Sequence, residues 1–248
     1  MRTPLLACSI LLLAAANTPS RASGLALRWD ACVRGDGVAN ASFACDMNTG
    51  SSSLFASFAI PYDLSYLPHG YESVIDVATA GTELSPWWSM ACRGTSMTFT
   101  DRLPSPCGAI TGGEAILSVA WFISPRGPNA ARFVVSSTLV NPPRFGFVIH
   151  EIEYGIVGLV VDHAKTVGPE ACGGCLTPAC IVFNSLKIFS SVQGVPPDLT
   201  LNTAGFGAGS NSVTWQGGAG VQVGPAIGCP AATAARRSAW GEVKALYR

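Results

Sequence analysis

The chain has 248 residues, a formal net charge of zero, and only 12% charged residues. Without a basic excess it lacks the electrostatic footprint that binding to nucleic acid or to an anionic membrane surface requires, so we expect neither partner. Its 27 glycines and 17 prolines lie between apolar runs, which is typical of many short strands joined by turns. The composition therefore predicts an all-β protein.

The N-terminus has the layout of a secretory signal peptide. Arg2 precedes an apolar run from Leu5 to Ala16 that ends in small residues. This run is too short to cross a bilayer as a stable helix, so we expect residues 1–22 to be removed, with cleavage after Ala16 or Ala22. We expect the mature protein to be secreted into the periplasm or the medium, or held at the cell surface, without stable membrane insertion.

Residues 23–229 show about ten strand-like segments. Two of them, Ala115–Ile123 and Arg132–Val140, are long and rich in apolar and β-branched residues, which indicates strands covered on both faces or lying in the middle of a sheet. Turn-forming residues at 124–129 would let these two form one hairpin. The other strands are expected, in chain order, at 25–30, 54–60, 72–79, 96–100, 144–153, 155–161, 181–190 and 211–216.

No segment between these strands has the apolar periodicity of a crossover helix, so the pairing should be antiparallel. We predict one β-sandwich domain over 23–229, with a jelly roll as one topology that fits. Residues 230–248 read as a linker followed by a short helix with Trp240, Val243 and Tyr247 on one face. This tail is either an export or attachment signal, a docking segment for a partner, or a helix packed on its own domain.

Nine cysteines occur, and removal of the leader with Cys8 leaves an even number, as expected for a disulfide framework in an exported chain. Pairing is formally open, but sequence distance favours the local pairs Cys32–Cys45 and Cys92–Cys107. The remaining cysteines would then tie the loop before strand 181–190 to the C-terminal region. They are Cys172, Cys175, Cys180 and Cys229.

The cluster Cys172, Cys175 and Cys180 has two sharper interpretations. With His163 it offers four zinc ligands of suitable chemistry, but an oxidising compartment consumes thiolates as disulfides. A redox role for Cys172 and Cys175 needs an exposed thiolate, usually at a helix N-terminus, whereas a strand follows here. We therefore expect a stapled loop, with no metal and no cofactor.

Catalytic patterns are sparse. The chain has no Gly-x-Ser-x-Gly elbow, and His150 is not followed by the second histidine of a zinc-protease motif. Glu151 and Glu153 fall on one face of a strand, where a pair of carboxylates can serve glycoside hydrolysis but is more often a solvated face. Asp162 and His163 form a second, equally unspecific acid–base pair. Catalysis is the less favoured prediction.

Aromatic residues suggest a binding role. Exposed rings on a β-sandwich can stack on sugars, although packing in the core is the alternative for each of them. The candidates follow Pro86 or lie in a loop-like stretch with proline and glycine. They are Tyr62, Tyr66, Tyr71, Trp87 and Trp88.

Three segments carry a resemblance. They are the Trp-Gly-x-x-Lys-x-Leu-Tyr-Arg ending at 240–248, the Cys-x-x-Cys-x-x-Pro-x-Cys-Ile-Val-Phe-Asn-Ser segment at 172–185, and Val-Thr-Trp-Gln-Gly-Gly at 213–218. Together they resemble uncharacterised exported proteins of environmental bacteria, mainly over the C-terminal third. The resemblance implies bacterial export and supplies no catalytic residue.

The sequence thus predicts a secreted, non-catalytic β-sandwich that binds or assembles at the bacterial cell surface or outside the cell. A glycan or another surface component is the expected kind of partner. The alternative is an extracellular hydrolase that acts on glycans, which would need Glu151, Glu153, Asp162 or His163 to meet in a cleft. The oligomeric state stays open at this level.

Overall fold

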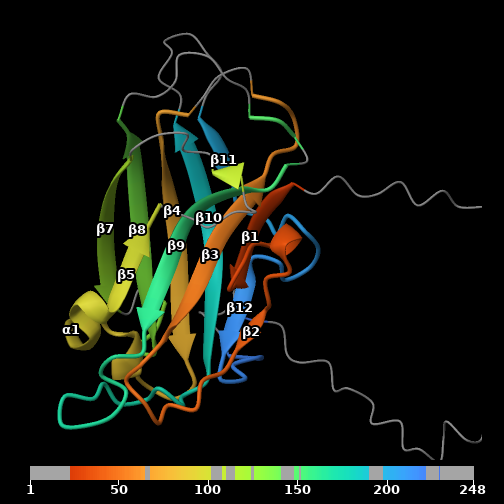
Figure 1. Ribbon diagram of the computed structural model, residues 1–248. Helices are drawn as coiled ribbons and strands as arrows, with labels where there is room; N and C mark the ends of the chain where they lie inside the picture. Colours follow the sequence, from red (N-terminus) through yellow and green to blue (C-terminus); the bar gives the residue numbers. More distant parts are fainter. Residues whose placement is uncertain are drawn as a thin grey trace, which may run out of the picture.

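The computed structural model describes residues 23–64, 68–101, 108–109, 115–123, 126–140, 148–150, 152–189, 198–221 and 229. In these residues two β-sheets pack face to face, which confirms the predicted all-β sandwich (Figure 1). The expected signal peptide and the expected C-terminal helix lie outside the described residues. No described helix has the length and apolar character needed to span a membrane.

The strands that the structure describes are β1 (Gly24–Trp29), β2 (Asn40–Ala41), β3 (Ser51–Ala59), β4 (Gly70–Thr79), β5 (Met97–Thr100), β6 (Gly108–Ala109), β7 (Ala115–Ile123), β8 (Ala130–Leu139), β9 (Tyr154–Asp162), β10 (Ala179–Phe189), β11 (Leu199–Leu201) and β12 (Ser212–Trp215). The helical turns are η1 (Val33–Gly35), η2 (Pro86–Trp88), α1 (Met90–Arg93) and η3 (Gly94–Ser96). Most of the predicted strands are confirmed. Of the strand expected at 144–153, residues 148–150 and 152–153 are described and form no strand, only an isolated bridge from Val148 to Leu64.

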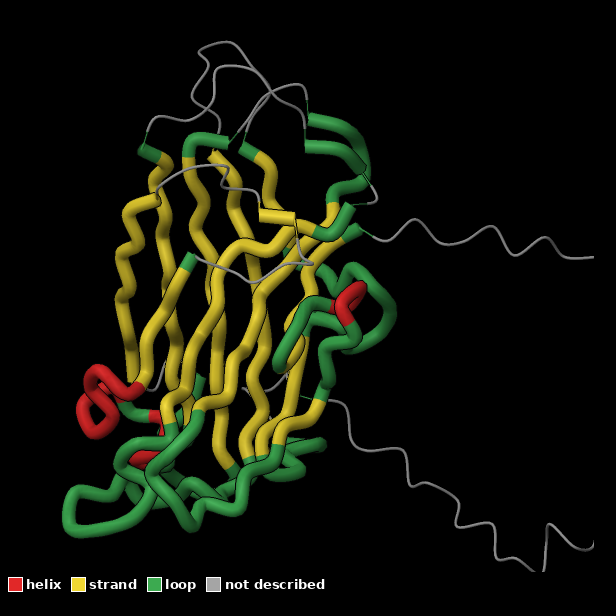
Figure 2. Tube along the Cα trace, viewed as in Figure 1, coloured by secondary structure: helices red, strands yellow, loops and turns green. Residues whose placement is uncertain are grey.

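The two sheets differ in width. The first has the order β1-β3-β9-β5, with β6 beside β9, and the second has the order β2-β12-β10-β4-β8-β7, with β11 beside β10. Pairing is antiparallel except for β2 with β12 and β6 with β9. Figure 2 shows the strands side by side in two layers, with loops at both ends and most helical turns at the lower end. The predicted hairpin of β7 and β8 is confirmed.

Alternation along the strands builds the core. In β4, Tyr71, Ile75 and Val77 belong to the buried cluster between the sheets, whereas Asp76 and Ala78 lie on the opposite face because side chains alternate along a strand. A smaller buried cluster on that outer face contains Ala78, Val182 and Cys229. The second sheet therefore buries side chains on both faces near β4 and β10.

Four tryptophans fill the lower end of the core. Trp215 is the hub: its ring centroid lies 5.6 Å from that of Trp29, 6.2 Å from that of Trp87 and 5.8 Å from that of Trp88. Its indole N–H donates to the carbonyl oxygen of Cys175 at 2.7 Å. The cluster thus packs directly against the cysteine-rich loop.

Arg93 of α1 covers the tryptophan cluster at this end of the core. Its guanidinium lies 3.8 Å from the centre of the Trp87 ring and donates to the backbone carbonyls of Ala164 and Asp162. Burial lowers the pKa of Arg93 to about 10, so the side chain stays charged at neutral pH. A buried cation satisfied by carbonyl oxygens and an aromatic face locks α1 to the loop that follows β9.

Three disulfides have both cysteines among the described residues, and each uses one cysteine of the cluster. They are Cys45–Cys175, Cys92–Cys172 and Cys180–Cys229. The expected local pairs Cys32–Cys45 and Cys92–Cys107 are therefore wrong, and Cys107 itself lies outside the described residues. Cys32 is disulfide-bonded as well. The predicted link between the cluster and Cys229 is confirmed.

The placement of β7 corrects a second expectation. Its apolar sequence indicated a covered or central strand, yet β7 ends the second sheet and pairs only with β8 among the described strands. The facing strand β5 has four residues against the nine of β7, so it covers only part of the inner face. In Figure 1 β7 forms the left margin of the sandwich.

We predict the disulfide map of the non-reduced protein. Alkylation under acid conditions followed by proteolysis and mass spectrometry should link Cys45 to Cys175, Cys92 to Cys172 and Cys180 to Cys229. Free thiols at Cys172 and Cys175 would contradict the stapled loop. A Cys32–Cys45 peptide would contradict the fold, because Cys45 lies 5.9 Å from Cys175 between Cα atoms.

Candidate functional site

The predicted aromatic residues do not form one surface. Trp87 and Trp88 are 0% exposed and Tyr71 is also buried, with its hydroxyl donating to the carbonyl of Ile156 at 2.8 Å. Burial raises the pKa of that phenol. Tyr62 is 56% exposed, and Tyr66 lies outside the described residues. Core packing, the alternative for these rings, therefore holds for three of them, which leaves them unavailable for stacking on a sugar.

The predicted acidic pair does not form a catalytic cleft in the described residues. Glu153 is buried, and its carboxylate accepts hydrogen bonds from the Val33 and Arg34 N–H groups and from the Ser57 hydroxyl, at 2.9, 2.8 and 2.5 Å. These bonds hold η1 against the first sheet and leave little of the carboxylate for a substrate. Glu151 lies outside the described residues.

Asp162 and His163 are also engaged locally. The Asp162 carboxylate accepts from the N–H of Ala164 at 2.7 Å, which caps the turn after β9. The His163 ring stacks on Phe43 at 3.7 Å between centroids and is buried. The described residues contain no cluster of three metal-binding side chains, and the cysteines near His163 are in disulfides.

The sequence did not predict a contact between Ser52 and His163 that the structure shows. The Ser52 hydroxyl lies 3.0 Å from His163 Nε2, and the ring's Nδ1 lies 3.2 Å from the carbonyl oxygen of Thr49. A serine beside an oriented histidine is the core of a nucleophilic site. However, the ring is buried under Phe43, and the neighbouring pocket of about 500 Å³ is lined by Cys45, Thr166 and residues 172–178. The pair reads as a hydrogen bond that ties β3 to the end of β9.

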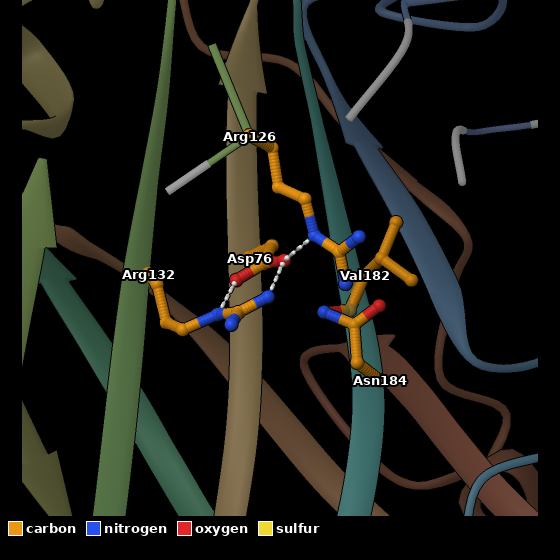
Figure 3. Close-up of polar contacts among 5 residues, drawn as sticks. All are labelled: Asp76, Arg126, Arg132, Val182 and Asn184. Carbon is orange, nitrogen blue, oxygen red and sulfur yellow. Dashed lines mark hydrogen bonds and ion pairs between the residues drawn. The ribbon is translucent and has the colours of Figure 1, made fainter. Parts of the chain in front are cut away.

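The outer face of the second sheet carries a buried ion-pair cluster. Asp76 is fully buried and accepts two hydrogen bonds of 2.7 Å from Arg132, which lies directly opposite it on β8. Arg126 adds a 3.6 Å ion pair from the segment before β8. Figure 3 shows both guanidinium groups converging on the Asp76 carboxylate. These hydrogen bonds raise the pKa of Arg132, so its guanidinium stays charged where it joins β8 to β4.

This cluster borders the edge strand. Phe122 of β7 lies directly opposite Arg132 in the sheet register, and its side chain is 51% exposed. Ile116, on the same outer face, is 65% exposed, and the inner-face residues Val119 and Ile123 are 38% and 58% exposed. We call the strand Ala115–Ile123 with these side chains the β7 edge.

Among the residues that the structure describes, nothing protects the β7 edge in the ways that usually protect an edge strand. Such strands are usually short, charged, interrupted by proline or covered by a loop. Residues 115–123 contain neither a charge nor a proline. No described residue other than those of β8 forms a backbone hydrogen bond with this strand. Within the described part of the chain, the N–H and C=O groups on the outward side of β7 thus have no strand beside them.

The opposite side of the sandwich shows the contrast. The free side of β1 is covered by the loop at 203–210, where Leu25 N–H donates to Thr203 and Leu27 N–H donates to Ser210, at 2.7 and 2.8 Å. In the second sheet, β10 is bordered by β12 and β11, and β12 by the two-residue β2. The β7 edge is the long exposed edge of the described sandwich, and it is the candidate functional site.

Comparison with known proteins adds no assignment to this geometry. No protein-family model matches the chain, and no curated protein shows significant similarity to it.

The ion-pair cluster yields a stability prediction. Asp76→Ala should lower the free energy of unfolding by about 2 kcal/mol, because it leaves Arg132 partly buried without its carboxylate. Glu72→Ala, on the same strand and face but partly exposed, is the matched control and should change stability by less than about 0.5 kcal/mol. Urea denaturation measures both. Equal effects of the two variants would show that the Asp76 pair contributes nothing.

Proposed function

We propose that the protein is a non-catalytic binding or structural module that works outside the cytoplasm, at the bacterial cell surface or beyond it. The observation that carries the proposal is the β7 edge, a nine-residue strand without charge or proline and with large apolar side chains exposed on both faces. Exposed apolar surface concentrated on one strand marks a site of protein association rather than of chemistry.

The disulfides support the location. Each of the three described pairs joins segments separated by 49 to 130 residues, and such bonds form and persist in oxidising compartments. A signal peptide over residues 1–22 would deliver the chain to one. Secretion, attachment to the surface and retention in the periplasm all agree with this environment.

A binding role through β7 is favoured over the two other candidate roles. A glycan-binding face would need exposed rings, and Trp87, Trp88 and Tyr71 are buried. A glycan hydrolase would need free carboxylates in a cleft, and those of Glu153 and Asp162 are taken up by local hydrogen bonds. The β7 edge offers backbone pairing instead, which fits a protein partner.

Expression of the whole chain in a bacterial host tests the proposal. We expect a processed protein in the periplasm or the medium, with an N-terminus that follows Ala16 or Ala22. The purified protein should release no sugar from a panel of polysaccharides and should hydrolyse no simple ester.

Two variants make the negative result interpretable. If wild-type protein released sugar and the activity vanished in a folded Glu153→Gln or Glu151→Gln variant, the module would be a hydrolase and the proposal would fail. Loss of an esterase activity in Ser52→Ala would overturn it in the same way. Retention of the unprocessed chain in the cytoplasm would contradict the proposed location.

A further inference from the structure

We infer that the partner of the β7 edge is a second copy of this chain, paired through β7 in antiparallel orientation about a two-fold axis at Val119. This inference rests on the proposed function, because the inference names the partner of the same β7 edge. In such a dimer the second sheets of the two copies join into one continuous sheet. The first sheets need not touch.

The sequence of β7 is self-complementary about Val119. In a two-fold antiparallel pair, residues equally distant from the axis face one another on the same side of the sheet. Next to the axis a small residue faces a small one, the next two pairs outward join large apolar residues, and the outermost pair joins a small residue to a large one. They are Ser118 with Ala120, Leu117 with Trp121, Ile116 with Phe122, Ala115 with Ile123, and Val119 with itself.

Side-chain size and direction fit this register. Ile116 and Phe122, the exposed outer-face residues, meet across the interface, and apolar cross-strand pairs of this kind stabilise a sheet. On the inner face Leu117 meets Trp121, and both already pack against the core. A shift of one residue would place outer-face residues opposite inner-face residues, so the alternation of the strand disfavours it.

Charge also permits a partner of identical sequence. Homotypic contacts fail when like charges face each other, and residues 115–123 carry none. On the neighbouring strand β8, the charged residue Arg132 lies opposite Phe122, three residues from the axis. The guanidinium groups of the two copies are therefore roughly 20 Å apart along the strand direction, beyond the Debye length of about 8 Å at physiological salt.

The expected interface is small. A nine-residue strand is about 30 Å long, and the side chains left exposed on β7 amount to about two large apolar residues per copy. The surface area that these side chains would bury lies below the roughly 800 Å² per partner of a standard stable interface. Dimerisation should therefore depend on concentration, with a monomer in dilute solution.

Analytical ultracentrifugation of the purified, disulfide-bonded chain over a range of concentrations tests the inference. Wild-type protein should convert from monomer to dimer as its concentration rises. Ser118→Lys with Ala120→Lys puts like charges directly opposite each other twice and should raise the dissociation constant by roughly tenfold or more. Ser118→Glu with Ala120→Lys changes the same two exposed positions but pairs opposite charges, and it should dimerise at least as well as wild type.

Thr138→Lys, an exposed substitution on the neighbouring strand β8, is the control for added charge and should behave as wild type. Circular dichroism confirms that each variant is folded. A wild-type protein that is monomeric at every concentration would overturn the inference, as would equal association of the two double variants.

The other possible occupants are outcomes of the same experiment. If removal of residues 230–248 turned a monomer into a dimer, the chain's own tail would occupy β7 and the inference would be wrong. A monomer at every concentration leaves the proposed function standing, because the β7 edge then has a different protein as its partner. A tail seated on β7 would instead remove the observation that carries the proposed function. If the protein dimerised as expected but released sugar, the proposed function would fail and the inferred dimer would stand.

Discussion

The loop at Cys172–Cys180 determines how this sandwich is closed. Its three cysteines bond to Cys45, Cys92 and Cys229, residues that precede β3, lie in α1 and follow β12. Because each bond closes a long stretch of chain, it removes many conformations from the unfolded state. The same loop accepts the indole hydrogen bond of Trp215, so the covalent links and the tryptophan cluster stabilise the same end of the core.

The function that we propose lies at a different part of the molecule from this closed end. The side chains that the sequence offered as catalytic candidates make structural hydrogen bonds instead. Glu153 holds η1, and His163 joins β3 to β9. The β7 edge differs, because exposed apolar side chains coincide there with a strand side that no described strand borders. The Asp76–Arg132 pair fastens β8 to β4, which gives this edge a rigid support.

Much of the fold could be predicted from sequence because apolar alternation records burial. The strands at 70–79, 154–162 and 179–189 were expected close to where they lie. Cysteine pairing could not be predicted, since it depends on a topology that brings residues 80 and 130 positions apart together. Composition also misled at two places. Trp87 and Trp88 follow Pro86 and looked like loop residues, whereas η2 turns both rings inward. The β7 sequence is as apolar as a central strand, yet apolarity does not say what covers it.

We infer that the disulfide loop closes one end of this sandwich and that β7 pairs with a second copy of the chain. Hydrogen exchange of the intact protein at low and high concentration tests it most directly, because backbone pairing protects amides. The account predicts that protection of residues 115–123 rises with concentration, while β3, bordered by β1 and β9, is protected equally at both. Protection of β7 that is complete in dilute monomer, or unchanged by concentration, would contradict it.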